Sequence, residues 1–161
     1  SVTVDTGAVE NIGSFAGNEV IRGGGGNDNI FLTTGGQDTV VFDVVAGQEA
    51  NATGGNGSDQ ITGFTFALGA DKDAIVLDDL LLGYTTAVNL DNQATVLAGF
   101  LDLVQNGNNL ELSIDRDGAG GTHQQTLLAT FVDTNLSDIN GATSEWAALR
   151  HMLATSTLVV L

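Results

Sequence analysis

A nine-residue pattern that occurs twice without a defect constrains this chain more than any other feature. Gly23–Phe31 reads GGGGNDNIF and Gly54–Thr62 reads GGNGSDQIT. Both fit G-G-x-G-x-D-x-U-x, in which U is a large apolar residue. The glycine half makes a turn whose backbone visits positive φ and passes close to an ion, where a Cβ would obstruct it. The second half is a very short strand whose apolar residue points inward. The pattern therefore predicts stacked turns that alternate with short strands.

The oxygen atoms that such turns offer suit calcium. Turn carbonyls and Asp carboxylates are hard ligands of the kind that Ca²⁺ binds at about 2.3–2.6 Å. One turn supplies only part of a coordination shell, so stacked turns must share each ion. We therefore expect several Ca²⁺ ions, bound by the Asp28 and Asp59 carboxylates and by the backbone carbonyls of Gly23, Gly25, Gly54 and Asn56.

Two imperfect copies flank the first intact repeat. In the copy over 14–22, an acid stands nine residues before Asp28. The copy over 33–41 loses the first two glycines and contains one inserted residue. An array this short and irregular predicts a roll of only about two coils. The surviving positions that are further candidate ligands are Glu19, Gly36 and Asp38.

Acids outside the repeats form a second group of candidate ligands. The pair at 71 and 73 sits in a turn and can consist of simple turn formers. The pair at 115 and 117 precedes a glycine, as in an EF-hand, but that loop would end at Gln124 and lack the bidentate Glu. A calcium turn of another type and a plain hairpin turn both stay open there. The candidates of this group are Asp43, Asp71, Asp73, Asp115 and Asp117.

The charge balance excludes two classes of partner. Asp and Glu number 20 against 4 Lys and Arg, a formal net charge of −16. Nucleic acid and anionic membrane surfaces are therefore poor partners. A hydrophobic content of 42% argues against an acidic, disordered tail. An acidic surface of the halophile type remains an alternative explanation of the charge.

The chain contains no cysteine, so neither a disulfide framework nor a thiolate metal site is available. If the protein is extracellular, calcium is the obvious substitute for disulfides. We expect no membrane insertion, because the apolar runs are only a few residues long. The start of the chain lacks both the charge and the apolar core of a signal peptide. The absence of an initiator Met indicates the C-terminal piece of a longer protein.

Downstream of the repeats the pattern is mixed. Phe64, Phe66 and Leu68 alternate as in a strand with one buried face, and 74–77 is a continuous apolar strand. We expect a helical turn at 80–82, a helix from 90 to about 99, and strands at 100–105, 110–114 and 126–132, with a hairpin turn at 106–109. Thr143 or Ser144 can cap a final helix with Trp146, Leu149 and Leu153 on one face. The chain ends in a strand at 158–161.

Three features in order resemble one family. They are the intact nonapeptides; the run from Asp59 to Phe64 with the run from Ala70 to Leu81; and Ser113-Ile114-Asp115-Arg116-Asp117-Gly118. Together they resemble the C-terminal target domain of proteins exported by type I (ABC transporter) systems, and most closely the carboxyl end of large bacterial RTX adhesins involved in biofilm attachment. One departure is Gly63, which stands where the family usually has Asp.

The resemblance implies a mainly β fold. A short, calcium-binding parallel β-roll over 1–64 leads into a β-rich, sandwich-like cap over 65–161 with a few short helices. It also implies an uncleaved secretion signal at about 143–161 that the ABC transporter reads, and calcium-triggered folding outside the cell. We therefore expect a secreted protein at the bacterial cell surface, of which this chain is a monomeric module.

We expect no enzymatic activity. His123 and His151 are the only histidines, and neither has a neighbour in sequence that makes a nucleophile–base pair. Two alternatives stay open. The chain can be the accessory RTX domain of a secreted metalloprotease or lipase, although neither H-E-x-x-H nor G-x-S-x-G occurs in it. It can also be a lectin-like domain that uses calcium to coordinate sugar.

Overall fold

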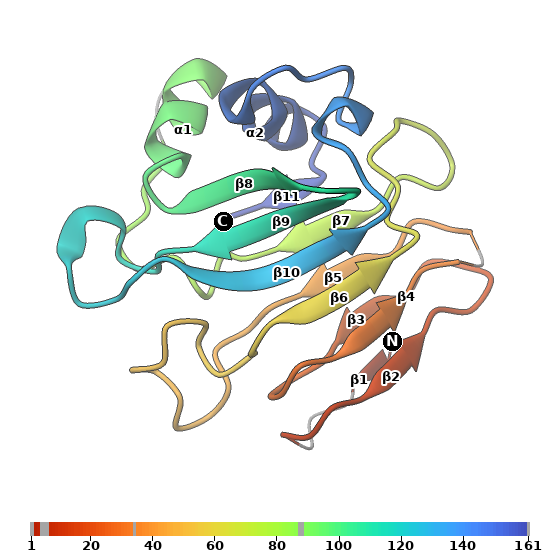
Figure 1. Cartoon of the computed structure of the whole chain (residues 1–161), viewed down its shortest axis with the longest axis horizontal. Helices are drawn as coiled ribbons and strands as arrows, with labels where there is room; N and C mark the ends of the chain where they lie inside the picture. Colours follow the sequence, from red (N-terminus) through yellow and green to blue (C-terminus); the bar gives the residue numbers. More distant parts are fainter. Residues whose placement is uncertain (1, 4–6, 34, 87–88, 161) are drawn as a thin grey trace.

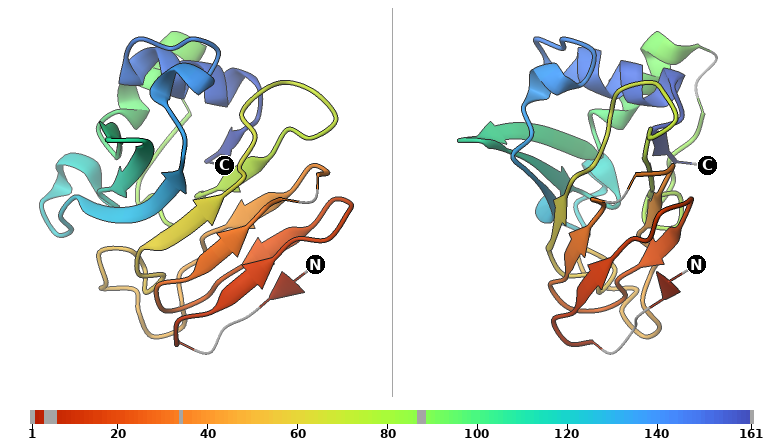
Figure 2. Two further views of the ribbon diagram at one scale, coloured as in Figure 1. Left: turned by 45° about the vertical axis from the view of Figure 1, so that its right-hand side comes forward. Right: turned by 90° about the vertical axis from the view of Figure 1, so that its right-hand side faces the viewer.

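The chain winds through two stacks of short parallel strands. In the computed structural model, which describes residues 2–3, 7–33, 35–86 and 89–160, the backbone passes alternately from one stack to the other. Figure 1 shows the path, and Figure 2 shows the stacks as two layers. One stack contains β1 (Val2–Thr3), β3 (Val20–Arg22), β5 (Thr39–Val41) and β7 (Ala74–Val76). The other contains β2 (Asn11–Gly13), β4 (Asn29–Phe31) and β6 (Asp59–Thr62).

One apolar side chain of each short strand from β2 to β7 fills the space between the stacks. In the second stack the parallel register places Ile12 beside Ile30 and Ile30 beside Ile61. In the first stack Ile21, Val40 and Ile75 are aligned in the same way. All six are at most 3% exposed. The inward position that the nonapeptide predicts is therefore confirmed, and each such burial is worth about 2 kcal/mol relative to exposure.

Both sheets continue beyond the repeats. The first sheet gains β11 (Leu158–Val159), which lies parallel to β7. The second gains β10 (Thr126–Val132), parallel to β6, and then the antiparallel strands β9 (Asn109–Ile114) and β8 (Leu101–Asn106). The roll and the cap therefore share two uninterrupted sheets across residue 64.

Two helices pack on each other at the end of the molecule away from β1 and β2 (Figure 1). α1 (Leu90–Leu97) begins at Asn89, whose side chain accepts the amide of Asn92, and α2 (Glu145–Ala154) begins at Ser144, whose side chain accepts the amide of Ala147. Two short 3-10 turns, η1 (Gly118–Gly120) and η2 (Leu136–Asp138), lie in the connections. The expected helices and the 106–109 hairpin are confirmed. No helix in the described part of the chain is both long and apolar enough to cross a membrane.

Several expectations of detail were wrong. The roll is longer than two coils, because strands at 2–3, 11–13 and 74–76 also join the stacks. Residues 64–68 form no strand: Phe64 and Phe66 are buried against Phe131, with ring centroids 4.7–5.2 Å apart within this trio, while Leu68 is 67% exposed. The alternation there reflects aromatic packing and not strand structure. Hydrogen bonds between Thr65 and Asp73 hold this segment as a loop, and it does not pair with a neighbouring strand.

Two other elements also differ from expectation. Residues 80–82 form no helix: the amide of Leu80 closes a turn on the Leu77 carbonyl at 2.9 Å, and the amide of Leu82 donates to the Arg116 carbonyl at 2.7 Å. In α2 the buried face consists of Ala148, Leu149 and Met152, whereas Trp146 is 40% exposed. A helix advances about 100° per residue, which carries Trp146 off that face. The last residue of the expected 158–161 strand lies outside the described residues.

Candidate metal centre

Acidic residues line up at both edges of the roll, each at the start of a short strand. We call Glu10, Asp28 and Asp59, which precede or begin β2, β4 and β6, the first acid column. We call Glu19, Asp38 and Asp73, which precede β3, β5 and β7, the second acid column. The columns follow from the winding, because every full coil returns the acidic position to the same edge.

Backbone hydrogen bonds fix the spacing in the first acid column. The amide of Glu10 donates to Asp28 Oδ1 at 2.9 Å, and the amide of Asp28 donates to Asp59 Oδ1 at 2.8 Å. Each carboxylate thus uses one oxygen to hold the coil before it. Because both bonds join residues far apart in sequence, the column works as a staple between coils.

The second acid column repeats this arrangement. The amide of Glu19 donates to Asp38 Oδ1 and the amide of Asp38 to Asp73 Oδ1, both at 2.9 Å. At the last position Asp73 Oδ2 also accepts the amide of Thr65 at 2.8 Å. The side chain of Asp71 joins the same edge, where its Oδ1 accepts the amide of Gly36 at 3.1 Å.

The remaining oxygens of the first acid column converge beside a glycine. Asp28 is 1% exposed, and among the described residues its Oδ2 has no hydrogen-bond partner. A Cβ on Gly23 would lie 2.3 Å from Asp28 Oδ2 and 3.4 Å from Asp59 Oδ2. A buried carboxylate oxygen without a partner is costly unless a cation or a proton balances it. Asp28 Oδ2 and Asp59 Oδ2 beside a bare backbone therefore form a donor set that fits a hard cation.

Stacking these carboxylates changes their acidity. Burial raises the pKa of Asp59 from 3.8 to about 7, against the hydrogen bond from the amide of Asp28, and the charges of Asp28 and Glu10 raise it further. Burial likewise raises the pKa of Asp73 to about 6, with the charges of Asp38 and Asp71 adding to the effect. Each column therefore favours the uptake of positive charge.

Glycines let the turns stack without side chains between them. At Gly36, with φ of +112°, a Cβ would lie 1.7 Å from the Gly17 carbonyl oxygen. At Gly57, with φ of +76°, it would lie 2.0 Å from the Gly26 carbonyl oxygen. Gly63 is similar: its φ is +84° and a Cβ would lie 2.5 Å from a carbonyl oxygen. An Asp side chain at that position would not fit this backbone.

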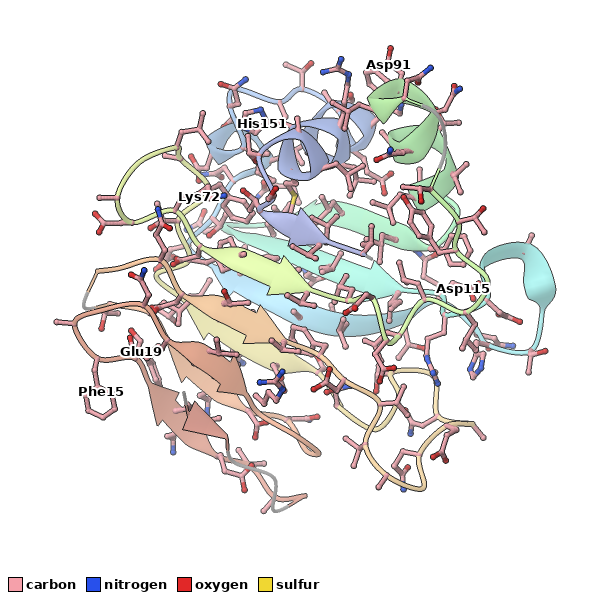
Figure 3. The ribbon with its side chains drawn as sticks, turned by 180° about the vertical axis from the view of Figure 1, so that it is seen from behind. Phe15, Glu19, Lys72, Asp91, Asp115 and His151 are labelled. Atoms are coloured by element: carbon pink, nitrogen blue, oxygen red, sulfur yellow. The ribbon has the colours of Figure 1, made fainter. Side chains whose placement is uncertain are left out.

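The second edge is the more open one. A pocket of about 360 Å³ is bordered there by Asp38, Asp71 and Asp73, and a neighbouring pocket of about 290 Å³ by Glu19, Asp38 and Lys72. In Figure 3 Glu19 and Lys72 lie on the same side of the molecule, opposite Asp115. Glu19 Oε2 is buried and has no hydrogen-bond partner.

Other candidates lie apart from the columns. Asp43 forms an ion pair with Arg22, with 2.8 Å between Oδ2 and Nε. The side-chain amide nitrogen of Asn56 donates to the backbone carbonyls of Asp43 at 2.8 Å and Thr53 at 2.7 Å. Near these side chains a pocket of about 190 Å³ opens at the first edge. Of the glycines, Gly25 lies against the Gly55 carbonyl and Gly54 against the Leu80 side chain.

The pair at 115 and 117 shapes a loop far from both columns. Asp117 Oδ2 accepts the amide of Thr122 at 2.8 Å, and its Oδ1 accepts the amide of His123 at 3.1 Å. Asp115 Oδ1 lies 3.3 Å from the amide of Asp117. Both carboxylates are thus engaged with the backbone, so the structure does not bring them to the acid columns.

Within the described ranges, no three or more His, Cys, Asp or Glu side chains cluster closely enough to hold a metal. Successive acids of one column instead place two carboxylates together beside glycine-rich backbone. A metal held there would need carbonyl oxygens to complete its shell, which agrees with the shared-turn arrangement that the repeat predicts. The donor set is therefore carboxylate and carbonyl oxygen.

Sequence reasoning missed two residues. Glu10 belongs to the first acid column, and its signal was the match of Glu10-Asn11-Ile12 to Asp28-Asn29-Ile30. Arg116 is 1% exposed and donates to three backbone carbonyls, those of Leu80 at 3.1 Å, Glu49 at 2.7 Å and Asn51 at 3.0 Å. It holds the loop before the second intact repeat against the cap, and nothing local in the sequence indicates those partners.

Comparisons with known proteins give structural similarity only. No family model and no curated protein matches the chain. The C-terminal domain (RV) of MpAFP superposes with a TM-score of 0.48 at 21% identity, over 82% of this chain and 85% of that one. The AlgE6R3 subunit of the Azotobacter vinelandii mannuronan C5-epimerase superposes with a TM-score of 0.30 at 18% identity, over 80% of this chain and 72% of that one.

Proposed function

We propose that this chain is a calcium-dependent folding and type I secretion module at the C-terminal end of a large secreted or cell-surface RTX adhesin. The observation that carries the proposal is the convergence of Asp28 Oδ2 and Asp59 Oδ2 on the bare backbone of Gly23. Both acids occupy the same position of an intact nonapeptide, so the motif and the geometry agree on the same atoms.

The acid columns explain how such a module would respond to calcium. Bound Ca²⁺ supplies the positive charge that the stacked carboxylates lack. Without it, carboxylates held one coil apart repel each other, and the glycine-rich turns lose much conformational entropy on ordering. Binding free energy then becomes folding free energy. At the low free calcium of a cytosol the roll would stay open, and at millimolar extracellular calcium it would close.

Export requires the chain to be unfolded when a transporter threads it. We expect the export information at about 143–161, of which 143–160 are described. In the folded molecule this segment is packed away, since Leu149 and Met152 are fully buried and Leu158 is 3% exposed. The segment can therefore serve as a signal before folding and as part of the core afterwards, without cleavage.

A secretion assay in cells that carry the matching transporter tests the proposal. Deleting 143–161 should retain the protein in the cell. The matched control is Leu110→Asp, which places a charge at a fully buried cap position and leaves the C-terminal segment intact. That variant should still be exported, because a threaded chain need not fold first. Export of the deletion variant at the level of the intact chain would contradict the proposal.

A further inference from the structure

Lys72 is the only lysine of the chain, and it stands between Asp71 and Asp73. The ion pairs among the described residues are Arg22 with Asp43 and Arg150 with Asp91, so Lys72 pairs with neither of its neighbours. Its Nζ donates instead to the backbone carbonyl of Thr155, the residue at which α2 ends. Positive charge is favourable at that end of a helix. The lysine thus connects the turn of the second acid column to the C-terminal helix.

The residues that follow Lys72 complete this attachment. The amide of Ile75 donates to the Thr157 carbonyl at 2.7 Å, and the amide of Leu77 donates to the Val159 carbonyl at 2.8 Å. These bonds place β11 beside β7 in parallel register. The stretch 71–77 therefore carries both the acids at the end of the second acid column and the contacts that hold the C-terminal segment.

Lys72 also borders the pocket that Glu19 and Asp38 line. Its ammonium group is a compact charge on a flexible four-carbon stem, so it can turn between nearby acceptors. Figure 3 shows Glu19 of the second acid column on one side of Lys72, and on the other side α2, which carries His151. Arg22, the arginine near the first acid column, cannot turn between acceptors in this way, because it is already paired with Asp43.

We propose that Lys72 couples cation binding at the second acid column to docking of the C-terminal segment 145–160. The proposal rests on the calcium function put forward above. With Ca²⁺ balancing the carboxylates, the ammonium group stays on the Thr155 carbonyl and the segment stays docked. Without Ca²⁺, the carboxylates attract the ammonium group and the segment loses that contact. Linkage is reciprocal, so docking in turn strengthens ion binding at this column.

The test compares Lys72→Met with Arg22→Met in the full chain. Both variants remove one positive charge, and Met keeps most of the apolar stem. Trp146 is the only tryptophan, and its Nε1 donates to Thr95 Oγ1 on α1 at 3.2 Å, so its fluorescence reports the position of α2. The calcium midpoint of that signal should fall about 10-fold in Lys72→Met, a typical coupling, because no ammonium group then competes with Ca²⁺ for the carboxylates. It should stay near the wild-type value in Arg22→Met and in Lys72→Arg.

The outcomes separate this coupling from the calcium function. A wild-type chain with no calcium response in circular dichroism or fluorescence would overturn both. A calcium response with an unchanged midpoint in Lys72→Met would overturn only the coupling. If Lys72→Met does not fold, amide exchange of the wild-type chain decides instead. Amides of 145–160 should then lose protection at the same calcium concentration as those of 65–77, and loss at a different concentration would overturn the coupling.

Discussion

The roll and the cap share two sheets but are held together differently. In the roll, β2, β3, β4 and β5 are three residues long, and each contributes mainly one buried apolar residue. In the cap, β8, β9 and β10 are six or seven residues long and pair antiparallel. An aromatic cluster and two helices add to that core. Each coil of the roll is therefore held together by much less apolar packing than the cap.

The difference shows where the roll obtains its remaining stability. Its coils are joined by carboxylates that accept amides from the neighbouring coil. Burial raises the pKa of Asp59 and Asp73, and repulsion from the neighbouring carboxylates raises it further. A cation turns that repulsion into attraction, whereas we expect the apolar packing of β8, β9 and β10 in the cap to need no cation. Within one pair of sheets, we thus expect an ion-dependent part and an ion-independent part.

The largest loss of stability is expected from a substitution that inserts a side chain between two coils. Gly36→Ala should lower the free energy of unfolding by about 4 kcal/mol, because its Cβ would overlap the Gly17 carbonyl oxygen. Gly107→Ala in the cap is the matched control: φ is also positive, +60°, but no atom lies within 4 Å of the added Cβ. It should cost only about 1 kcal/mol. Urea unfolding in calcium measures both, and equal losses would show that strain, not stacking, explains the glycine.

The next effect separates ligation from general charge relief. Asp59→Asn keeps the shape of the side chain but removes its charge, so in millimolar calcium we expect a loss of about 2–3 kcal/mol of stability. Asp102→Asn, on β8 of the cap, removes the same charge and should change stability by less than about 0.5 kcal/mol. In excess EDTA the penalty at Asp59 should vanish. If both variants behave alike in calcium, general charge relief would be the better explanation.

The smallest effect is a pH dependence that is confined to the metal-free roll. Burial raises the pKa of Asp59 from 3.8 to about 7, so between these values the folded state holds a proton that the unfolded state releases. The stabilisation is full below pH 3.8 and is lost as pH rises through about 7, by about 1 kcal/mol per pH unit. Amide exchange in EDTA should show better roll protection at pH 5 than at pH 8. In Asp59→Asn the difference should shrink to the part that Asp73 supplies, since burial raises the pKa of Asp73 to about 6. An undiminished difference would assign the dependence to groups other than Asp59.

Much of the roll was predictable because its information is local. A glycine turn, an acid and an inward apolar residue recur within nine positions, and the structure places Ile30 and Ile61 as that pattern requires. The number of coils was underestimated because the outer coils lack the glycines. Glu10-Asn11-Ile12 keeps only the acid and the apolar residue, so its membership becomes visible only through its pairing with β4.

The long-range contacts were not predictable from the sequence. Arg116 finds two of its three acceptors in a loop more than sixty residues earlier, and Lys72 finds Thr155 more than eighty residues later. From its sequence neighbours alone, each of these two residues would be predicted to be an ordinary surface cation. The alternation of Phe64 and Phe66 predicted burial correctly but strand structure wrongly. Hydrogen bonds between Asp73 and Thr65 hold this segment in place of pairing with a neighbouring strand.

Residue-resolved amide exchange at neutral pH, in excess EDTA and in millimolar calcium, tests the central claim most directly. The account predicts that amides of 11–62 are protected in calcium and exchange freely in EDTA, because the acid columns need a cation to close. It predicts that amides of 101–132 stay protected in both conditions, because apolar packing holds the cap. Equal protection of 11–62 in EDTA and in calcium would contradict an ion-dependent roll.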